Sequence, residues 1–351
     1  DTMRVSVLRG IEKFYIYRYD SVNMVRTMDS LVIYNPGIRR YNFNSSLGNV
    51  GSSLFAPFYF SDFLLGFSVG IDSRRLFIWQ SGDLRFVNSH KRYSRVNYVN
   101  GSKKENYIEV EHSQSFGKNL DIGFRYNRIN SLGYYTSQQT YLSRLNLYGR
   151  LSSRNARYLL LFNVALNSNK NQENGGLVSD AAFEGDSVGN VKYIGVNLSG
   201  AQSVVKDNSF MVHQHYDFGR RVGSRQEAVG SEQPRDSAGN ELTATDSLVF
   251  VPGFRLGHEV SYRKNSFLYS DGLPASGFYQ AINLDSVSTN DSIGVRNIEN
   301  TLSFTFFSKE KNYLSFSGRH QYSEVSYGAT TPDTSGLSVF CLLYTSDAAD
   351  E

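Results

Sequence analysis

Hydrophobic and polar residues alternate along much of the chain, most clearly in residues 119–129, NLDIGFRYNRI. One parity of this stretch is apolar or aromatic: Leu120, Ile122, Phe124 and Tyr126. The other parity carries Asn119, Asp121, Arg125 and Asn127, with Gly123 neutral between them. A period of two predicts a β-strand whose two faces meet different surroundings. At about 3.3 Å per residue, such a strand is long enough to cross the hydrocarbon core of a bilayer when tilted.

The same alternation recurs from residue 92 onwards and predicts about eleven strands. They cover residues 92–99, 105–115, 119–130, 139–151, 156–168, 191–204, 209–220, 247–263, 266–270, 295–307 and 313–327. Short connections, among them 206–208 and 264–265, alternate with long ones at 169–190, 222–246 and 271–294. Outer-membrane barrels have short turns at one end and long loops at the other. We therefore predict an all-β fold, an antiparallel transmembrane β-barrel, over a soluble β-sandwich that binds carbohydrate through its tyrosines.

Residues 1–90 are less regular, with short strand-like pieces separated by Gly- and Ser-rich segments. We expect an N-terminal lead-in that is periplasmic or lumen-associated and contributes some strands, and a small β subdomain is the alternative. Residues 91–340 are expected to form the transmembrane barrel strands.

The composition of the chain is compatible with a β-barrel and excludes a helical membrane protein. The chain has 24 Tyr, 24 Phe and 30 Gly against 6 Pro, as expected for aromatic-rich strands joined by turns. Its mean hydropathy is −0.38, and no apolar run approaches the roughly 20 residues of a membrane helix. A β-barrel is compatible with this value because only alternate residues meet lipid. The net charge of +3 is small and its basic residues are scattered, so no nucleic-acid partner is expected.

If the apolar parity faces lipid, the charged parity must face a water-filled lumen, because Arg or Lys at the bilayer midplane costs about 2–4 kcal/mol. This argument predicts that ten residues line a pore: Glu109, Glu111, Asp121, Arg125, Asn127, Arg255, Glu259, Arg263, Glu299 and Arg319. The alternative is that these charges pair with one another and close the lumen.

Other candidate chemistry is sparse. His213 and His215 lie two apart on a predicted strand and share a face, but no third metal ligand is evident nearby, so a polar wall is the preferred interpretation. The acidic stretch 176–186 lacks the ligand spacing of a calcium loop. No nucleophile elbow or phosphate-binding glycine loop is present. We expect no catalytic residues, no metal and no cofactor.

Several segments together resemble one known family. They are IYNPGIRRYNF (33–43), LGNVG (47–51), GSKKE (101–105) followed by EVEHSQ, INSLGYY (129–135), SSRNARY (152–158) and NQENGG (171–176). In order and spacing they are similar to the putative-porin family of Bacteroidetes outer membranes, over residues 29–183. The resemblance implies an outer-membrane β-barrel without catalytic residues. Members of that family are generally longer, which implies that this chain is a fragment.

The last eleven residues, 341–351 (CLLYTSDAADE), fit neither a strand nor a turn, and the barrel pattern stops after Tyr327. Translated back into codons, they match the DNA of a transposase-based sequencing adapter. We therefore expect this tail to be a sequencing-adapter artefact that packs poorly against an incomplete barrel with unpaired edges.

The expected function is passive diffusion of small hydrophilic solutes through a porin-like channel in the bacterial outer membrane. The expected partners are the lipid bilayer and those solutes. The alternative is an outer-membrane barrel whose long extracellular loops carry a surface-binding or structural role.

Overall fold

A computed structural model gives the architecture. It describes residues 5–9, 19–22, 45–46, 48–55, 69–70, 72–80, 85–89, 92–155, 157–179, 194–224, 247–273, 277–279, 289–307, 313–327 and 333–344.

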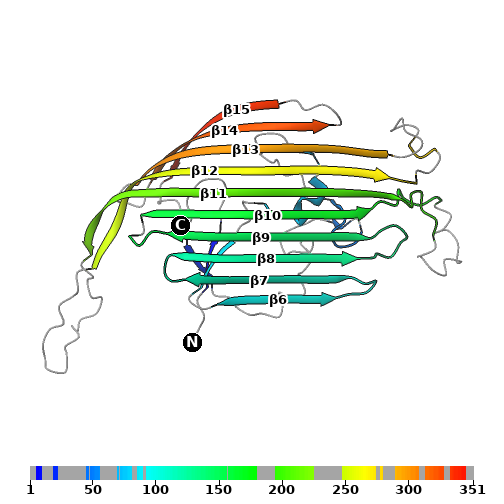
Figure 1. The fold of residues 1–351 in the computed structure, drawn as a ribbon, viewed down its shortest axis with the longest axis horizontal. Helices are drawn as coiled ribbons and strands as arrows, with labels where there is room; N and C mark the ends of the chain where they lie inside the picture. Colours follow the sequence, from blue (N-terminus) through cyan, green and yellow to red (C-terminus); the bar gives the residue numbers. More distant parts are fainter. Residues whose placement is uncertain are drawn as a thin grey trace, which may run out of the picture.

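Ten antiparallel strands form one sheet in which every strand pairs with its neighbours in the sequence (Figure 1). They are β6 (Tyr93–Asn100), β7 (Asn106–Phe116), β8 (Leu120–Ser131), β9 (Thr140–Ser152), β10 (Tyr158–Gln172), β11 (Ala201–Ser224), β12 (Ser247–Asp271), β13 (Thr289–Phe307), β14 (Tyr313–Tyr327) and β15 (Asp333–Tyr344). This up-and-down order is the strand arrangement of an antiparallel β-barrel. Because the strands form one sheet rather than two stacked layers, the soluble sandwich is ruled out. Among the described strands, β6 and β15 are the two edges of the sheet.

Two predicted turns are wrong. Residues 206–208 lie inside β11, which runs for 24 residues, and residues 264–265 lie inside β12, which runs for 25. Asp207 is directly opposite Asn265 in the register of these two strands. The polar residues that were taken for turns therefore pair across the sheet.

The merged strands also change the pattern of connections. Residues 225–246 link β11 to β12, whereas residues 173–200 and 272–288 link β10 to β11 and β12 to β13. Successive connections of a meander lie at opposite ends of the sheet. The long connections are therefore not all at one end, and this prediction from the sequence is wrong.

The expectation that the strand pattern stops after Tyr327 is also wrong. Strand β15 pairs with β14 and includes the first four residues of the terminal stretch, with Cys341 opposite Phe316 and Tyr344 opposite Tyr313. The expected poorly packed tail therefore begins, at the earliest, at residue 345. Residues 345–351 lie outside the described part of the chain.

Shorter elements precede the large sheet. Strands β1 (Val5–Arg9), β2 (Tyr19–Val22) and β5 (Arg85–Ser89) form a three-stranded sheet, and β3 (Ser45–Ser46) pairs with β4 (Leu54–Phe55). A 3₁₀ helix, η2, covers Asp72–Phe77. No helix within the described ranges is long and apolar enough to span a membrane.

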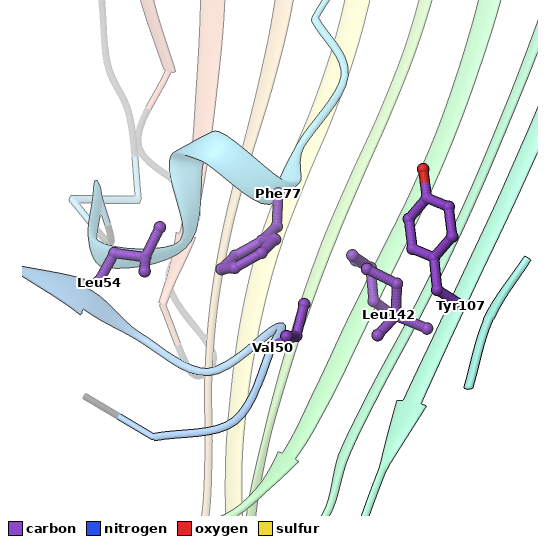
Figure 2. Close-up of a cluster of buried hydrophobic side chains, with 6 residues drawn as sticks. Val50, Leu54, Phe77, Tyr107 and Leu142 are labelled. Atoms are coloured by element: carbon purple, nitrogen blue, oxygen red, sulfur yellow. The ribbon is translucent and has the colours of Figure 1, made fainter. Parts of the chain in front are cut away.

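A small apolar core joins the N-terminal part to the large sheet (Figure 2). Val50, Leu54 and Phe77 pack against Tyr107 of β7 and Leu142 of β9, and Ile129 of β8 completes the cluster. Phe77 and Leu142 are fully buried. Residues 48–55 and 72–80, here called the covering segment, therefore lie on one face of β7–β9.

Candidate functional site: the polar face of the sheet

The two faces of the ten-stranded sheet differ in chemistry. On one face, here called the polar face, cross-strand register aligns side chains that are nearly all polar. One such row runs through β7–β14 as Glu111, Arg125, Asn146, Ala165, Ser209, Arg263, Asn297 and Ser323. The opposite side, the apolar face, carries a row of Phe124, Leu147, Val164, Phe210, Tyr262, Ile298 and Tyr322 on β8–β14.

All ten residues predicted to line a pore lie on the polar face. Glu109, Glu111, Asp121, Arg125 and Asn127 come from β7 and β8. The other five come from β12–β14 and align with them through the register: Arg255, Glu259, Arg263, Glu299 and Arg319.

An ionic cluster forms where β6, β7 and β8 meet. Arg95 places Nη2 2.7 Å from Glu109 and 2.9 Å from Glu111, and Arg125 Nη2 lies 3.0 Å from the other oxygen of Glu109. The hydroxyl of Tyr107 also donates to Glu109, at 2.6 Å. Glu109 is buried, so two cations and a hydroxyl compensate the loss of its hydration.

A second set of charges lies on β11 and β12. Arg255 donates from Nε and Nη2 to the two oxygens of Asp217, at 2.6 and 2.9 Å. Arg263 donates through Nε to Asp207 at 3.0 Å, and Asn265 donates to the same carboxylate at 2.8 Å. Arg255 and Arg263, two of the four arginines that the sequence assigned to a pore, are therefore held in ion pairs with Asp217 and Asp207. Such pairing was the basis of the alternative in which salt bridges close the lumen.

The covering segment lies on the polar face through its main chain as well as its side chains. Asn167 of β10 accepts from the Trp79 N–H at 2.9 Å and donates to the Trp79 carbonyl at 3.1 Å. Asn169 donates to the Gly51 carbonyl at 2.8 Å, and Thr140 donates to the Val50 carbonyl at 2.7 Å. Buried amide and hydroxyl groups of β9 and β10 thus satisfy main-chain groups that belong to no strand of the sheet.

Trp79 sits among the basic residues of the polar face. The guanidinium carbons of Arg125 and Arg144 lie 4.4 and 4.5 Å from the centre of its ring, within the range of cation–π attraction. Arg144 also donates to Asn127 at 3.0 Å and to the Phe77 carbonyl at 3.3 Å. The covering segment therefore contacts two of the predicted pore-lining residues, Arg125 through the ring and Asn127 through Arg144.

Arg74 fixes the other end of the same segment. Its Nη2 lies 2.7 Å from Glu173, beyond the end of β10, and donates to Ser203 of β11. Burial lowers the pKa of the Arg74 guanidinium, and Glu173 opposes that shift. Because the ordinary arginine pKa is so high, Arg74 stays charged and its ion pair persists.

The last residue of β12 organises a small cluster outside the sheet. Buried Asp271 accepts from the Tyr279 hydroxyl at 2.7 Å, and the hydroxyls of Tyr269 and Tyr279 lie 2.8 Å apart. Burial raises the pKa of Tyr279, and its bonds to Tyr269 and Asp271 raise it further. This cluster fixes residues 277–279 against the end of β12.

Sequence reasoning missed the residues that hold the covering segment: Arg74, Trp79, Arg144, Asn167 and Asn169. The signal for the asparagines was present, because β10 places asparagine at four of its buried positions: 163, 167, 169 and 171. A run of buried amides on one parity indicates that something polar lies opposite them. The sequence could not identify that partner, because Trp79 and Asn167 are 88 residues apart in the chain.

Comparison with known proteins agrees with this architecture. The family model described as "Putative porin" matches residues 13–341, nearly the whole chain. No curated protein and no solved structure matches the chain. Because the match covers far more than half of the sequence and the sheet has the order of an antiparallel barrel, the chain belongs to the putative porin family and has a porin-like β-barrel fold.

Proposed function

We propose that this protein is an outer-membrane channel for the passive diffusion of small hydrophilic solutes, without enzymatic activity. The observation that carries the proposal is the contrast between the two faces of one sheet. An apolar face is suited to lipid, and a face of carboxylates, guanidinium groups, amides and hydroxyls is suited to water and hydrated solutes.

The dimensions of the apolar face fit a bilayer. On β10, every residue of the apolar face from Tyr158 to Leu166 is apolar or aromatic. Eight steps of about 3.3 Å make this band roughly 26 Å long along the strand, close to the apolar band of about 25 Å in outer-membrane barrels. On other strands of the apolar face, large side chains such as Phe210 and Phe306 are well exposed, as expected for groups that contact lipid.

The polar face would set the selectivity of the channel by size and charge. The ten predicted pore-lining residues are among its charged and amide groups, and ion pairs such as Arg255–Asp217 hold several of them in fixed positions. The covering segment would narrow the path over β7–β11, where Trp79, Arg74 and Val50 contact the sheet. The polar residues of β12–β14 would form the less covered wall along which solutes pass.

The test is conductance across a planar bilayer, with a paired variant that loosens the covering segment. Arg74→Ala combined with Trp79→Ala removes the ion pair to Glu173 and the ring that Arg125 and Arg144 contact. We expect discrete conductance steps for the unaltered protein and larger steps for the double variant. Phe210→Ala is the matched control, because it removes an aromatic ring from the apolar face and should leave the step size unchanged.

A second candidate function is a barrel with a surface-binding or structural role carried by its long loops. The specific observation in its favour is the covering segment, which contacts polar-face residues on β7–β11. Absence of conductance in both the unaltered protein and the double variant, with the protein folded in detergent, would reject the channel and favour this alternative.

A further inference from the structure

Two histidines that are not among the ten predicted pore-lining residues lie side by side on the polar face of β11. His213 and His215 occupy successive inward positions, and both are buried. Nε2 of His213 lies 3.3 Å from Nδ1 of His215, with the ring centres 5.6 Å apart and the planes inclined by 67°. The two imidazoles thus face each other through ring nitrogens, the atoms that bind metal ions.

A carboxylate on the neighbouring strand supports one tautomer of this pair. Glu259 of β12 is directly opposite His213 in the register, and its Oε2 lies 3.4 Å from Nδ1 of His213. A negative charge beside Nδ1 favours a proton on that nitrogen, which leaves the lone pair of Nε2 directed towards His215. Carboxylates beside the non-ligating nitrogen are the usual outer partners of metal-binding histidines.

The spacing of the two donor nitrogens fits metal coordination. Two histidine nitrogens at about 2.0–2.1 Å from a tetrahedral metal ion lie roughly 3.3–3.4 Å apart. The observed separation of 3.3 Å matches this value. We propose that His213 and His215 bind a divalent transition-metal ion, with Glu259 as a positioning residue and water in the remaining coordination positions.

The surroundings define the class of ion. Within the described part of the chain, no group of three or more His, Cys, Asp or Glu is placed to hold a metal, so the protein ligands are the two imidazoles. Asp217, two positions further along β11, accepts hydrogen bonds from Nε and Nη2 of Arg255. Nitrogen donors disfavour Ca²⁺ and Mg²⁺, which prefer oxygen, and the general order of stability ranks Cu²⁺ above Zn²⁺.

The experiment uses the full chain in detergent, titrated with Cu²⁺ and observed by electron paramagnetic resonance, with Zn²⁺ competition measured by calorimetry. One equivalent of Cu²⁺ with hyperfine coupling to two nitrogens is expected. His213→Ala and His215→Ala should each weaken binding at least tenfold and remove the two-nitrogen signal. Glu259→Gln keeps both ligands and should weaken binding about 10–100-fold, the range for outer partners.

Two controls separate this site from other metal-binding groups. His258→Ala removes a histidine from the apolar side of β12, where its Nδ1 lies 3.4 Å from Gln214, and should bind Cu²⁺ as the unaltered protein does. Cys341→Ser removes the one thiol of the chain and should likewise leave binding unchanged.

Three results would overturn the proposal: no stoichiometric binding, a two-nitrogen signal that survives His213→Ala, or binding lost in Cys341→Ser instead. Circular dichroism of each sample reports whether the strands persist. If a histidine variant loses them, Glu259→Gln decides, because unchanged affinity in that folded variant also contradicts the proposed site.

Discussion

At the contact between the covering segment and the sheet, asparagine side chains make the hydrogen bonds to the main chain that a neighbouring strand would otherwise make. Asn167 makes with the main chain of Trp79 the same two bonds, one donated and one accepted, that a neighbouring strand would make. Asn169 and Asn171 both donate to the carbonyl of Gly51, and Asn49 donates back to the carbonyl of Gln138 at 2.6 Å. Such contacts recognise a main chain rather than particular side chains, so the asparagines of β10 determine where the segment lies.

Asn167→Ala should loosen the covering segment, because each of the two lost hydrogen bonds contributes about 1 kcal/mol. Trp79 is the only tryptophan of the chain, so its fluorescence reports on this contact alone. We expect emission shifted to longer wavelength and stronger quenching by acrylamide. Asn163→Ala is the matched control, because Asn163 bonds to the Leu147 carbonyl within the sheet. Identical spectra for the two variants would show that Asn167 does not hold the segment.

In β11 and β12, a cluster of polar residues lies in the middle of the strands and does not mark a turn at their ends. Asp207 is almost completely buried and accepts hydrogen bonds from Arg263 and Asn265 on β12. These bonds continue the ladder through the positions where Lys-Asp-Asn and Lys-Asn resemble turns. The two longest strands of the sheet therefore depend on a pairing between residues that are 56 positions apart.

Asp207→Ala should destabilise the protein by roughly 3–5 kcal/mol, because it leaves the Arg263 guanidinium without its buried partner. The neighbouring Lys206 is exposed on the other face of β11, so Lys206→Ala should change the free energy of unfolding by less than about 0.5 kcal/mol. Urea unfolding in detergent, followed by circular dichroism, measures both. Equal effects of the two variants would mean that the Asp207–Arg263 pair contributes little to the sheet.

How far the sequence predicts an element depends on whether its two faces meet different surroundings. Strand β8 was predicted to within a residue at each end, because the apolar residues from Leu120 to Tyr126 alternate with polar positions and one glycine. The two turns inside β11 and β12 were wrongly predicted because local composition cannot distinguish a turn from a cross-strand ion pair. Strand β15 was missed, and its pairing with β14 is not a local property of the sequence. The alternation of the sequence predicted which residues lie on the polar face. It could not predict the covering segment, because the contacts of that segment join distant parts of the chain.

At the scale of the whole molecule, the sheet separates one apolar surface from one polar surface, and the ion pairs of the predicted pore-lining residues lie on the polar side. Charge on that side should act on permeating ions, whereas charge on the other side should not. Arg255→Glu places a second carboxylate beside Asp217 and reverses the local field, so it should shift ion selectivity towards cations. Reversal potentials under a salt gradient provide the measurement. Arg296→Glu makes the same charge change on the apolar side, where Arg296 pairs with Glu324, and should leave selectivity unchanged.

The apolar face ends abruptly. Two residues beyond the row from Phe124 to Tyr322, Lys264, Arg296 and Glu324 stand opposite one another on β12–β14. On β11 the residue at the same step is Asn208. On β8–β10 the limit comes one step later, at Arg128, Ser143 and Ser168. In a bilayer this border would mark the boundary between the hydrocarbon core and the polar interface. If the sheet sank by two or more residues, cations would enter the hydrocarbon, each costing up to about 2–4 kcal/mol at the midplane. For a protein inserted as proposed, the parts of β11–β13 beyond this border would lie in water, and the border would fix the depth of insertion.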